Sequence, residues 1–447
     1  MLRRRVYAYL GVSLIVLWTL GTWYLASVAH SSKSKMPSME ERAELLERKI
    51  ADVERAIEQQ SKENRRLLDI LQEQVKRGQR RPVGSALPPA LSSLQTPTDN
   101  RIAVLVFACN RSKAVKNHIE QLLKLRSSQE RFPVIVSQDC QDQDTATVIK
   151  SYGDKLTFIQ HPDQSPITLP PKMKKFLGYY KIARHYQWAL NQTFYRFGYE
   201  TVIITEDDLD LSDDFFEYFT ATYPLLRLDP TLMCVSAWND NGKPDKIQND
   251  AKLLYRTDFF PGLGWMLTKD LWEELSWRWP TAFWDDWMRK PEQRKGRACI
   301  RPEIPRTAMS LHGKVGVSKG LYFEKHLKHI KKSTEFVAFT QMDLSYLLKD
   351  RYDQIFVQQV YAGPSITQTE LRSAKLSDGT PLPPSVRLTY EDKNTYKVTA
   401  KAFGLMDDFR AGVPRTAYRG VVPFMFAKTR VYLAPPATWK EYDPSWT

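Results

Sequence analysis

Three consecutive acidic residues, Glu206, Asp207 and Asp208, directly follow an apolar run at residues 201–205. Adjacent carboxylates repel one another, so the cluster is costly unless a cation offsets its charge. Hard oxygen ligands of this kind suit Mn²⁺ or Mg²⁺, which keep some waters and also bind phosphate oxygens. A solvated surface turn is the alternative interpretation. The position behind a buried strand favours a metal site, where the ion would neutralise a diphosphate leaving group.

A second acidic pair, Asp285 and Asp286, stands between Trp284 and Trp287. Large aromatic side chains reduce the solvation of a carboxylate, so we expect raised basicity and a general base here. The structural alternative is that the tryptophans pack in a core while the acids cap the following helix. The pattern alone does not choose between them.

A third candidate is the segment SLHGKVGVSKG at residues 310–320. Its three glycines give backbone freedom, and its lysines and Ser318 can donate to phosphate or sugar oxygens. The glycine spacing matches neither a phosphate-binding loop nor a dinucleotide fingerprint. A lid that closes over a donor and an ordinary surface loop are both open interpretations.

Short, nearly continuous apolar runs lead to these residues, at 102–109, 133–139, 156–161 and 201–208. Helix-like stretches at 114–125 and 181–197 lie between them. Such runs suit strands of a parallel sheet that is covered on both faces. The alternation predicts a doubly wound α/β architecture, in which ligands bind beyond the carboxyl ends of the strands. Alternating patterns at 386–404 and 418–435 predict antiparallel strands in a smaller C-terminal α+β domain.

The amino-terminal residues predict a membrane anchor. Residues 1–5 include three consecutive arginines, and residues 6–28 form an apolar run without charge. About 20 apolar residues span a bilayer. The run exceeds the apolar core of a signal peptide and carries Trp18, Trp23 and Tyr24, as interface anchors do. We expect a cytosolic tail at 1–5, a transmembrane helix at 6–28 and a lumenal remainder, with a cleaved signal peptide as the alternative.

The next segment, 29–100, is predicted to be a stem. Residues 39–77 are rich in charge and carry apolar residues at helical spacing, which suits either a coiled coil or a single solvated helix. Residues 80–100 form a Pro/Ser linker that cannot pack a core.

Four cysteines follow the predicted anchor: Cys109, Cys140, Cys234 and Cys299. An even number in an oxidising compartment favours two disulfides over a metal site, because no CxxC pair is present; buried free thiols are the alternative. The net charge is +14 without a recognised nucleic-acid motif, so we expect no nucleic-acid partner and only a modest attraction for anions.

Several longer words carry a family resemblance. ITEDD (204–208), SAWNDNGK (236–243), LLYRTDFFPGLGWML (253–267), FWDDWMR (283–289), GRACIRPEI (296–304) and YDPSW (442–446) are similar to the N-acetylglucosaminyltransferase I family of complex N-glycan synthesis. The resemblance extends from about residue 102 to residue 447. A sister family that adds GlcNAc to O-mannose shares parts of this core and is the close alternative.

The resemblance implies a GT-A glycosyltransferase (Rossmann-like) domain at 101–326, a linker at 327–350 and a C-terminal domain at 351–447. It implies Mn²⁺ as cofactor and UDP-GlcNAc as donor. The implied reaction is inverting transfer of GlcNAc in β-1,2 linkage to the α-1,3-arm mannose of Man5GlcNAc2, an oligomannose N-glycan on glycoproteins. The implied location is the Golgi membrane, with association with itself or with other Golgi glycosyltransferases. A non-catalytic tether or lectin would leave the two acidic clusters without a purpose.

The resemblance also assigns roles to single residues. Asp208 would bind Mn²⁺, and Asp285 would be the catalytic base. The residues implied to bind the donor are Cys109, Arg111, Asp139 and His185 around uridine, Asp207 near the ribose or the metal's waters, Glu206, Leu263 and Trp284 at the sugar, and Val317 and Ser318 in a covering loop. The implied disulfides are Cys109–Cys140 and Cys234–Cys299.

Overall fold

The computed structural model describes Ala51, Glu58, residues 101–314, residue 316 and residues 320–446. The predicted anchor, nearly all of the predicted stem, and Val317 and Ser318 lie outside the described residues. Within the part that is described, no helix has both the length and the apolar composition to cross a membrane. Gln95–Thr447 forms one compact unit. The domain boundaries near 326 and 350 stay predictions.

An eight-stranded sheet forms the centre of this unit, in the order β3-β2-β1-β4-β8-β6-β9-β7. Its strands are β1 (Ala103–Ala108), β2 (Val134–Gln138), β3 (Thr157–Gln160), β4 (Thr201–Glu206), β6 (Leu232–Ser236), β7 (Leu254–Thr257), β8 (Trp265–Thr268) and β9 (Ala298–Pro302). The first four strands are parallel, and they are the four that the apolar runs predict.

The sheet as a whole is mixed, which corrects the expectation of a parallel sheet. Strand β8 lies antiparallel to both β4 and β6, and β7 lies antiparallel to β9. Followed across the sheet, these pairings give β7 and β8 the same direction, opposite to the other six strands, and the segment 258–264 that joins them contains no helix. The α6 helix (Phe215–Leu228) lies between β4 and β6 in the chain, and β8 is inserted between these two strands.

Helices cover both faces of the sheet, as an α/β architecture requires. The helices α3 (Ser112–Leu125), α4 (Gln143–Lys150) and α6 pack on the face that carries Val104 and Val106. The helices α5 (Leu177–Asn191) and α7 (Lys269–Ser276) pack on the face that carries Leu105 and Phe107. Successive residues of β1 point to opposite faces, so one apolar run supplies both cores. The predicted helices at 114–125 and 181–197 are confirmed, and the second ends in a π-helical turn at Gln192–Arg196.

A short two-stranded sheet holds the acidic triplet in place. Strand β5 (Leu209–Leu211) pairs antiparallel with β10 (Thr307–Met309). The triplet therefore occupies the junction between β4, in the central sheet, and β5. The Ser310 N–H donates to the Asp208 carbonyl oxygen at 2.8 Å, which joins the triplet to the start of the glycine-rich segment.

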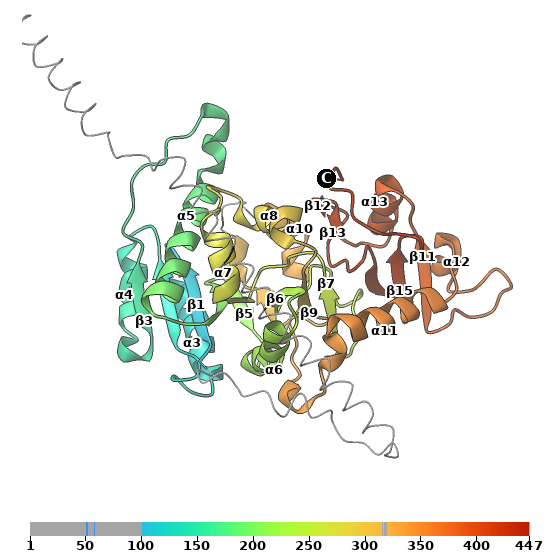
Figure 1. Cartoon of the computed structure of the whole chain (residues 1–447), viewed down its shortest axis with the longest axis horizontal. Coiled ribbons are helices and arrows are strands. Elements are labelled where there is room, and N and C mark those ends of the chain that lie inside the picture. The colour runs from blue at the N-terminus through green and yellow to red at the C-terminus, as the bar shows by residue number, and fades with distance from the viewer. Residues whose placement is uncertain (1–50, 52–57, 59–100, 315, 317–319, 447) are drawn as a thin grey trace, which may run out of the picture. The chain divides into compact units, whose positions relative to one another are not determined.

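The C-terminal part is α+β, as predicted, and lies at the opposite end of the compact unit from α3 and α4 (Figure 1). It contains α11 (Lys349–Ala362), α12 (Gln368–Ser373), β11 (Ser385–Thr389), α13 (Lys393–Ala402), β14 (Val422–Phe426) and β15 (Thr429–Ala434). The remaining elements are α8 (Trp284–Met288), α9 (Pro291–Arg294), α10 (Leu321–Lys325), β12 (Phe409–Arg410) and β13 (Val413–Pro414).

The two strand patterns of this part have different outcomes. The segment 418–435 forms the antiparallel pair β14 and β15, as predicted. The segment 386–404 is mostly helix α13, because Asp392 and Thr395 form a capping box that starts a helix there. Its one strand, β11, pairs parallel with β15, so the antiparallel prediction for this segment is wrong.

Both predicted disulfides are present. Cys109 and Cys140 join the ends of β1 and β2, and Cys234 and Cys299 join neighbouring strands β6 and β9 at positions in register. All four cysteines are paired, so the free-thiol and metal-site alternatives are excluded.

Candidate active site

The acidic triplet at the end of β4 is enclosed by the protein. Asp207 is 2% exposed and Asp208 is 7% exposed, so the interpretation as a solvated turn is wrong. One guanidinium contacts both carboxylates: Arg111 donates from Nη1 to Oδ2 of Asp208 at 2.8 Å and from Nη2 to Oδ1 of Asp207. Arg111 also donates to the His312 carbonyl oxygen at 3.2 Å. The structure therefore places Arg111 at the acidic triplet.

A buried histidine on α3 holds the residues on both sides of the triplet, one through its backbone carbonyl and the other through its side chain. His118 donates from Nδ1 to the Leu209 carbonyl oxygen at 2.7 Å and accepts at Nε2 from the Thr205 hydroxyl at 2.9 Å. This pairing defines the neutral tautomer. Burial lowers the pKa of His118 to about 4, which agrees with a neutral ring.

Two acids of the triplet have pKa values that are raised close to neutral pH. Burial, reinforced by the charge of Asp208, raises the pKa of Glu206 to about 7, while the Tyr186 hydroxyl opposes this by donating to its Oε1 at 2.8 Å. Burial also raises the pKa of Asp207 to about 7, against the opposing effect of Arg111. The three carboxyl groups of the site thus carry more negative charge than the single Arg111 guanidinium can offset.

The triplet has oxygens that fit a metal ion. Asp207 Oδ2 and Asp208 Oδ1 are buried and have no hydrogen-bond partner among the described residues. In the same described part of the chain, no group of three or more His, Cys, Asp or Glu side chains can hold a metal ion. A divalent ion that takes its other ligands from water and a diphosphate needs only one or two carboxylates. These carboxylate oxygens therefore fit a cation that takes further ligands from water and a diphosphate better than a cation held by protein side chains alone.

A second polar group lies at the carboxyl end of β2. Asp139 accepts from Gln164 Nε2 at 2.7 Å, and His161 Nδ1 lies 3.6 Å from the same oxygen. Burial opposes ionisation, but these two neighbours hold the pKa of Asp139 below its usual value. His185 shares a 2.7 Å hydrogen bond with Ser137, and burial lowers its pKa to about 3. This polar group thus offers a fixed carboxylate beside a neutral imidazole.

Stacked aromatic rings connect the polar group around Asp139 to the rest of the site. Phe107 at the end of β1 stacks on Tyr186 with ring centres 3.7 Å apart, and its edge meets His185. Tyr186 stacks on Trp284 at 4.4 Å. His185 and Tyr186 are adjacent on α5; His185 therefore reaches the polar group around Asp139, and Tyr186 reaches the second acidic cluster.

The second cluster lies in the first turn of α8, and Trp284 packs in the core beside it. Arg289 donates from Nη1 to both Asp285 and Asp286 at 2.8 Å, and Arg410 donates to Asp286 at 2.9 Å. The Asp285 side chain remains 43% exposed. Burial favours its neutral form, but Arg289 outweighs this and lowers the pKa of Asp285, so the expectation of raised basicity is wrong.

A cavity of about 420 Å³ connects the two acidic clusters. Of the predicted site residues it is lined by Glu206, Leu263, Trp284 and Asp285. Leu263 adopts a left-handed backbone, φ 51°, between two glycines, and its carbonyl oxygen accepts from Thr307 at 2.7 Å. The aromatic rings of Tyr179 and Phe283, stacked at 4.8 Å, form part of the wall. The segment PGLGW, residues 261–265, thus shapes one side of this cavity.

The described part of the glycine-rich segment lies against the metal candidate. Within it, a Cβ added to Gly313 would lie 3.6 Å from Asp208 Oδ2. Val317 and Ser318 lie outside the described residues, so both interpretations, lid and surface loop, stay open.

Comparison with known proteins identifies the family. A model of the GNT-I family matches residues 6–446. This chain belongs to the GNT-I family. A relative from Arabidopsis thaliana, named alpha-1,3-mannosyl-glycoprotein 2-beta-N-acetylglucosaminyltransferase, is 40% identical over 338 residues, which cover 75% of this chain and 74% of the relative. The resemblance stated from the sequence is confirmed.

Two solved structures are distantly similar to this GNT-I family chain. Mannosyltransferase PcManGT from Pyrobaculum calidifontis, in complex with GDP-Man and Mn²⁺, is 16% identical with a TM-score of 0.32 and covers 58% of this chain and 69% of its own. S. aureus TarS 1-349 in complex with UDP is 11% identical with a TM-score of 0.35 and covers 61% and 77%. Similarity at this level does not bear on the site.

Several side chains that hold or line the candidate site of this GNT-I family chain were not among the predicted site residues: His118, Tyr186, Arg289, Arg410 and Arg415. His118 had a signal, since it lies on the buried stripe of α3 with Val115, Ile119 and Leu122. Arg289 had one too, because it follows Asp285 by four residues and Asp286 by three, a helical spacing. Arg410 and Arg415 come from a distant segment, and only the fold brings them to this cavity.

Proposed function

We propose that this chain transfers GlcNAc from UDP-GlcNAc, with inversion and in β-1,2 linkage, to the α-1,3-arm mannose of Man5GlcNAc2 N-glycans. Such a transfer would start hybrid and complex N-glycan synthesis. The Arabidopsis relative carries the corresponding name, and it is 40% identical over three quarters of both chains. The observation that carries the proposal is one cavity bounded by Glu206 of the buried acidic triplet and by Asp285.

The proposed fold of the catalytic part is GT-A, with its Rossmann-like half in β3-β2-β1-β4. The carboxyl ends of β1, β2 and β4 lie at one edge of the sheet, since Phe107 is in register with both Ser137 and Glu206. Asp139 and the triplet follow β2 and β4 at this edge. Ligands of open α/β sheets bind at this edge, which supports placing the nucleotide there.

The nucleotide would be held at the polar group around Asp139. Asp139 has a lowered pKa, so it presents a carboxylate that accepts from the N–H of a uracil ring. His185 is neutral and buried against Ser137, so it adds no charge there. The Cys109–Cys140 disulfide joins the segments that follow β1 and β2, next to Asp139.

Manganese would be held by Asp208, with Asp207 beside it, through the two oxygens that lack protein partners. When bound, the ion supplies positive charge that stabilises a departing diphosphate. Arg111 lies across the same carboxylates, so it is placed to share the phosphate charge.

Asp285 is the proposed base of a single displacement. The mannose 2-hydroxyl oxygen forms a bond to the anomeric carbon as the bond to UDP breaks, and UDP leaves with that electron pair. The hydroxyl proton passes to the Asp285 carboxylate. Because its pKa is lowered, Asp285 is ionised at neutral pH and can accept the proton. Asp286 is less suited as the base, because Arg289 and Arg410 both donate hydrogen bonds to its carboxylate.

The proposed location is the Golgi membrane, with a type II anchor at 6–28, a stem at 29–100 and the catalytic part in the lumen. Two complete disulfides fit an oxidising compartment. Association with a second copy or with other Golgi glycosyltransferases belongs to the same proposal.

A test of the acceptor compares two substrates. The full-length chain would be incubated with UDP-GlcNAc and Mn²⁺, and with either Man5GlcNAc2 or an O-mannosyl peptide. We expect the sugar on the α-1,3-arm mannose, in a β-1,2 linkage seen by NMR. Transfer to the peptide alone would assign the chain to the O-mannose activity, and transfer to neither would favour a lectin or tether.

A further inference from the structure

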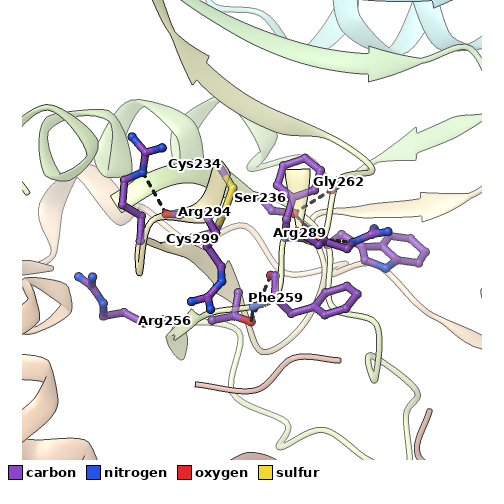
Figure 2. Close-up of a disulfide and its surroundings, with 12 residues drawn as sticks. Cys234, Ser236, Arg256, Phe259, Gly262, Arg289, Arg294 and Cys299 are labelled. Carbon is purple, nitrogen blue, oxygen red and sulfur yellow. Dashed lines mark hydrogen bonds between the residues drawn. A yellow bond between two sulfur atoms is a disulfide. The ribbon is translucent and has the colours of Figure 1, made fainter. Parts of the chain in front are cut away.

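A second cavity, of about 560 Å³, shares no lining residue with the cavity that connects the two acidic clusters. It lies between the C-terminal segment that contains Trp439 and Tyr442, and the residues around α9. Figure 2 shows Arg256 and Arg294, which line it, on one side of the Cys234–Cys299 disulfide, with Arg289 on the other. This second cavity is therefore a binding space separate from the one that connects the two acidic clusters.

Positive charge dominates the lining of this second cavity. Its basic residues are Arg256, Arg294, Lys349, Arg419 and Lys440, against the acidic residues Asp258 and Glu441. Some of this charge is offset nearby. Arg256 pairs with Asp229 at 2.7 Å, while Lys349 and Arg419 share the single carboxylate of Asp353. An excess of positive charge remains in the cavity.

Arg294 is the buried member of this set that forms no side-chain ion pair or hydrogen bond among the described residues, although its charge acts on the neighbouring Asp258 carboxylate. It is 8% exposed, and its Nε is enclosed with no hydrogen-bond partner in the described chain. Its guanidinium lies 5.3 Å from the centre of the Tyr442 ring. The neighbouring Asp258 carboxylate instead accepts from the Arg419 N–H at 2.8 Å and from the Tyr442 hydroxyl at 2.7 Å.

The enclosed Nε of Arg294 has no acceptor, which is costly, and an anion bound at the guanidinium would lower the cost of burying its charge. Guanidinium groups bind oxyanions through two parallel N–H donors, and nearby lysines add charge without fixed direction. The cavity is larger than one phosphate needs, and Trp439 and Tyr442 line it. A phosphate monoester with an apolar or ring-bearing substituent would fill it better than a free ion.

We propose that this second cavity is a phosphate-binding site, anchored by Arg294, that takes inorganic phosphate or a phosphate monoester. The site is separate from the proposed sugar transfer and does not depend on it. Arg294 supplies the directed hydrogen bonds, while Lys440 and Arg419 supply further charge at the rim.

The test is calorimetric titration of the full-length chain with inorganic phosphate and, in a second arm, with phenyl phosphate. EDTA is present and ionic strength is constant, so that metal-dependent binding at the acidic triplet does not contribute. We expect Arg294→Gln to weaken binding about ten- to a hundredfold, the effect of losing charged hydrogen bonds. Lys440→Gln, at an exposed position, should weaken it by less.

Arg227→Gln is the matched control, because it removes one arginine charge at an exposed pair with Asp270. Its phosphate affinity should stay within about twofold of the wild type. Tighter binding of phenyl phosphate would identify an ester as the ligand, and equal or weaker binding would identify the free ion. No binding to the wild type, or equal affinity in Arg294→Gln and Arg227→Gln, would overturn the proposal.

Discussion

The Arg111 guanidinium lies against the Asp208 carboxylate, with Nη1 2.8 Å from Oδ2. Asp208 is the residue proposed to bind the metal, so a protein cation already neutralises part of the metal site. The same guanidinium contacts Asp207, whose second oxygen is buried and lacks a partner among the described residues. An arginine and a metal ion can therefore contribute to one charge balance.

Replacing Arg111 should make stability depend on metal. Arg111→Gln leaves two buried acids without their cation, and we expect a loss of about 3 kcal/mol in the free energy of unfolding without metal. Mn²⁺ with UDP should restore most of it, because the ion offsets the same carboxylates. Urea unfolding measures both values. Arg184→Gln, which breaks an outer pair with Asp163, is the control. If Mn²⁺ and UDP stabilise both variants equally, Arg111 and the metal do not share a site.

Asp208→Ala should abolish Mn²⁺-dependent binding of UDP, as calorimetry would show. Asp210→Asn is the matched control, since Asp210 is an acid two positions away that accepts from Asn117 and Gln121. We expect its affinity for UDP to stay within about threefold of the wild type. Unchanged UDP affinity in Asp208→Ala would remove the metal role from this residue.

The two acids of the second cluster should differ in their effect on rate. Asp285→Asn should lower kcat by roughly 10²–10⁴, the usual contribution of a general base, while UDP affinity is retained. Asp286→Asn loses contacts to Arg289 and Arg410 but no proton acceptor, so we expect a decrease of less than about tenfold. Steady-state rates with saturating donor decide this. A larger loss in Asp286→Asn would reverse the assignment.

The buried His118 should make stability pH-dependent. Burial lowers its folded pKa to about 4 from its ordinary value of 6.5, so the unfolded chain binds more protons between these values. The stabilisation is therefore complete above pH 6.5 and is lost as pH falls towards 4; it amounts to about 3 kcal/mol. His118→Gln should flatten this slope in urea unfolding at pH 7, 5.5 and 4.5. His329→Gln, at an exposed position, should not. Equal slopes in both variants would show that His118 does not carry the dependence.

The first half of the sheet and the acidic triplet were predictable because local pattern determines them. The run from Thr201 to Thr205 carries no charge and is buried at every position because β4 is covered on both faces, and the three acids interrupt it abruptly. The even cysteine count likewise predicted two disulfides, and the family resemblance their pairing. These features need no knowledge of distant contacts.

Other features were not predictable because they depend on tertiary contacts. The reversed direction of β8 leaves no trace in a buried four-residue run. The pKa of Asp285 depends on the balance between burial and the charge of Arg289, and helical spacing alone does not reveal which of the two effects is larger. The Arg294 cavity requires the C-terminal segment to fold back near α9, which spacing along the chain does not reveal.

The most direct measurement of the central claim is a crystal structure with UDP and Mn²⁺, located by the anomalous scattering of manganese. We expect the manganese peak beside the unpartnered oxygens of Asp208 and Asp207, with the uracil ring against Asp139. A manganese peak elsewhere, with both carboxylates still held only by Arg111, would contradict the account.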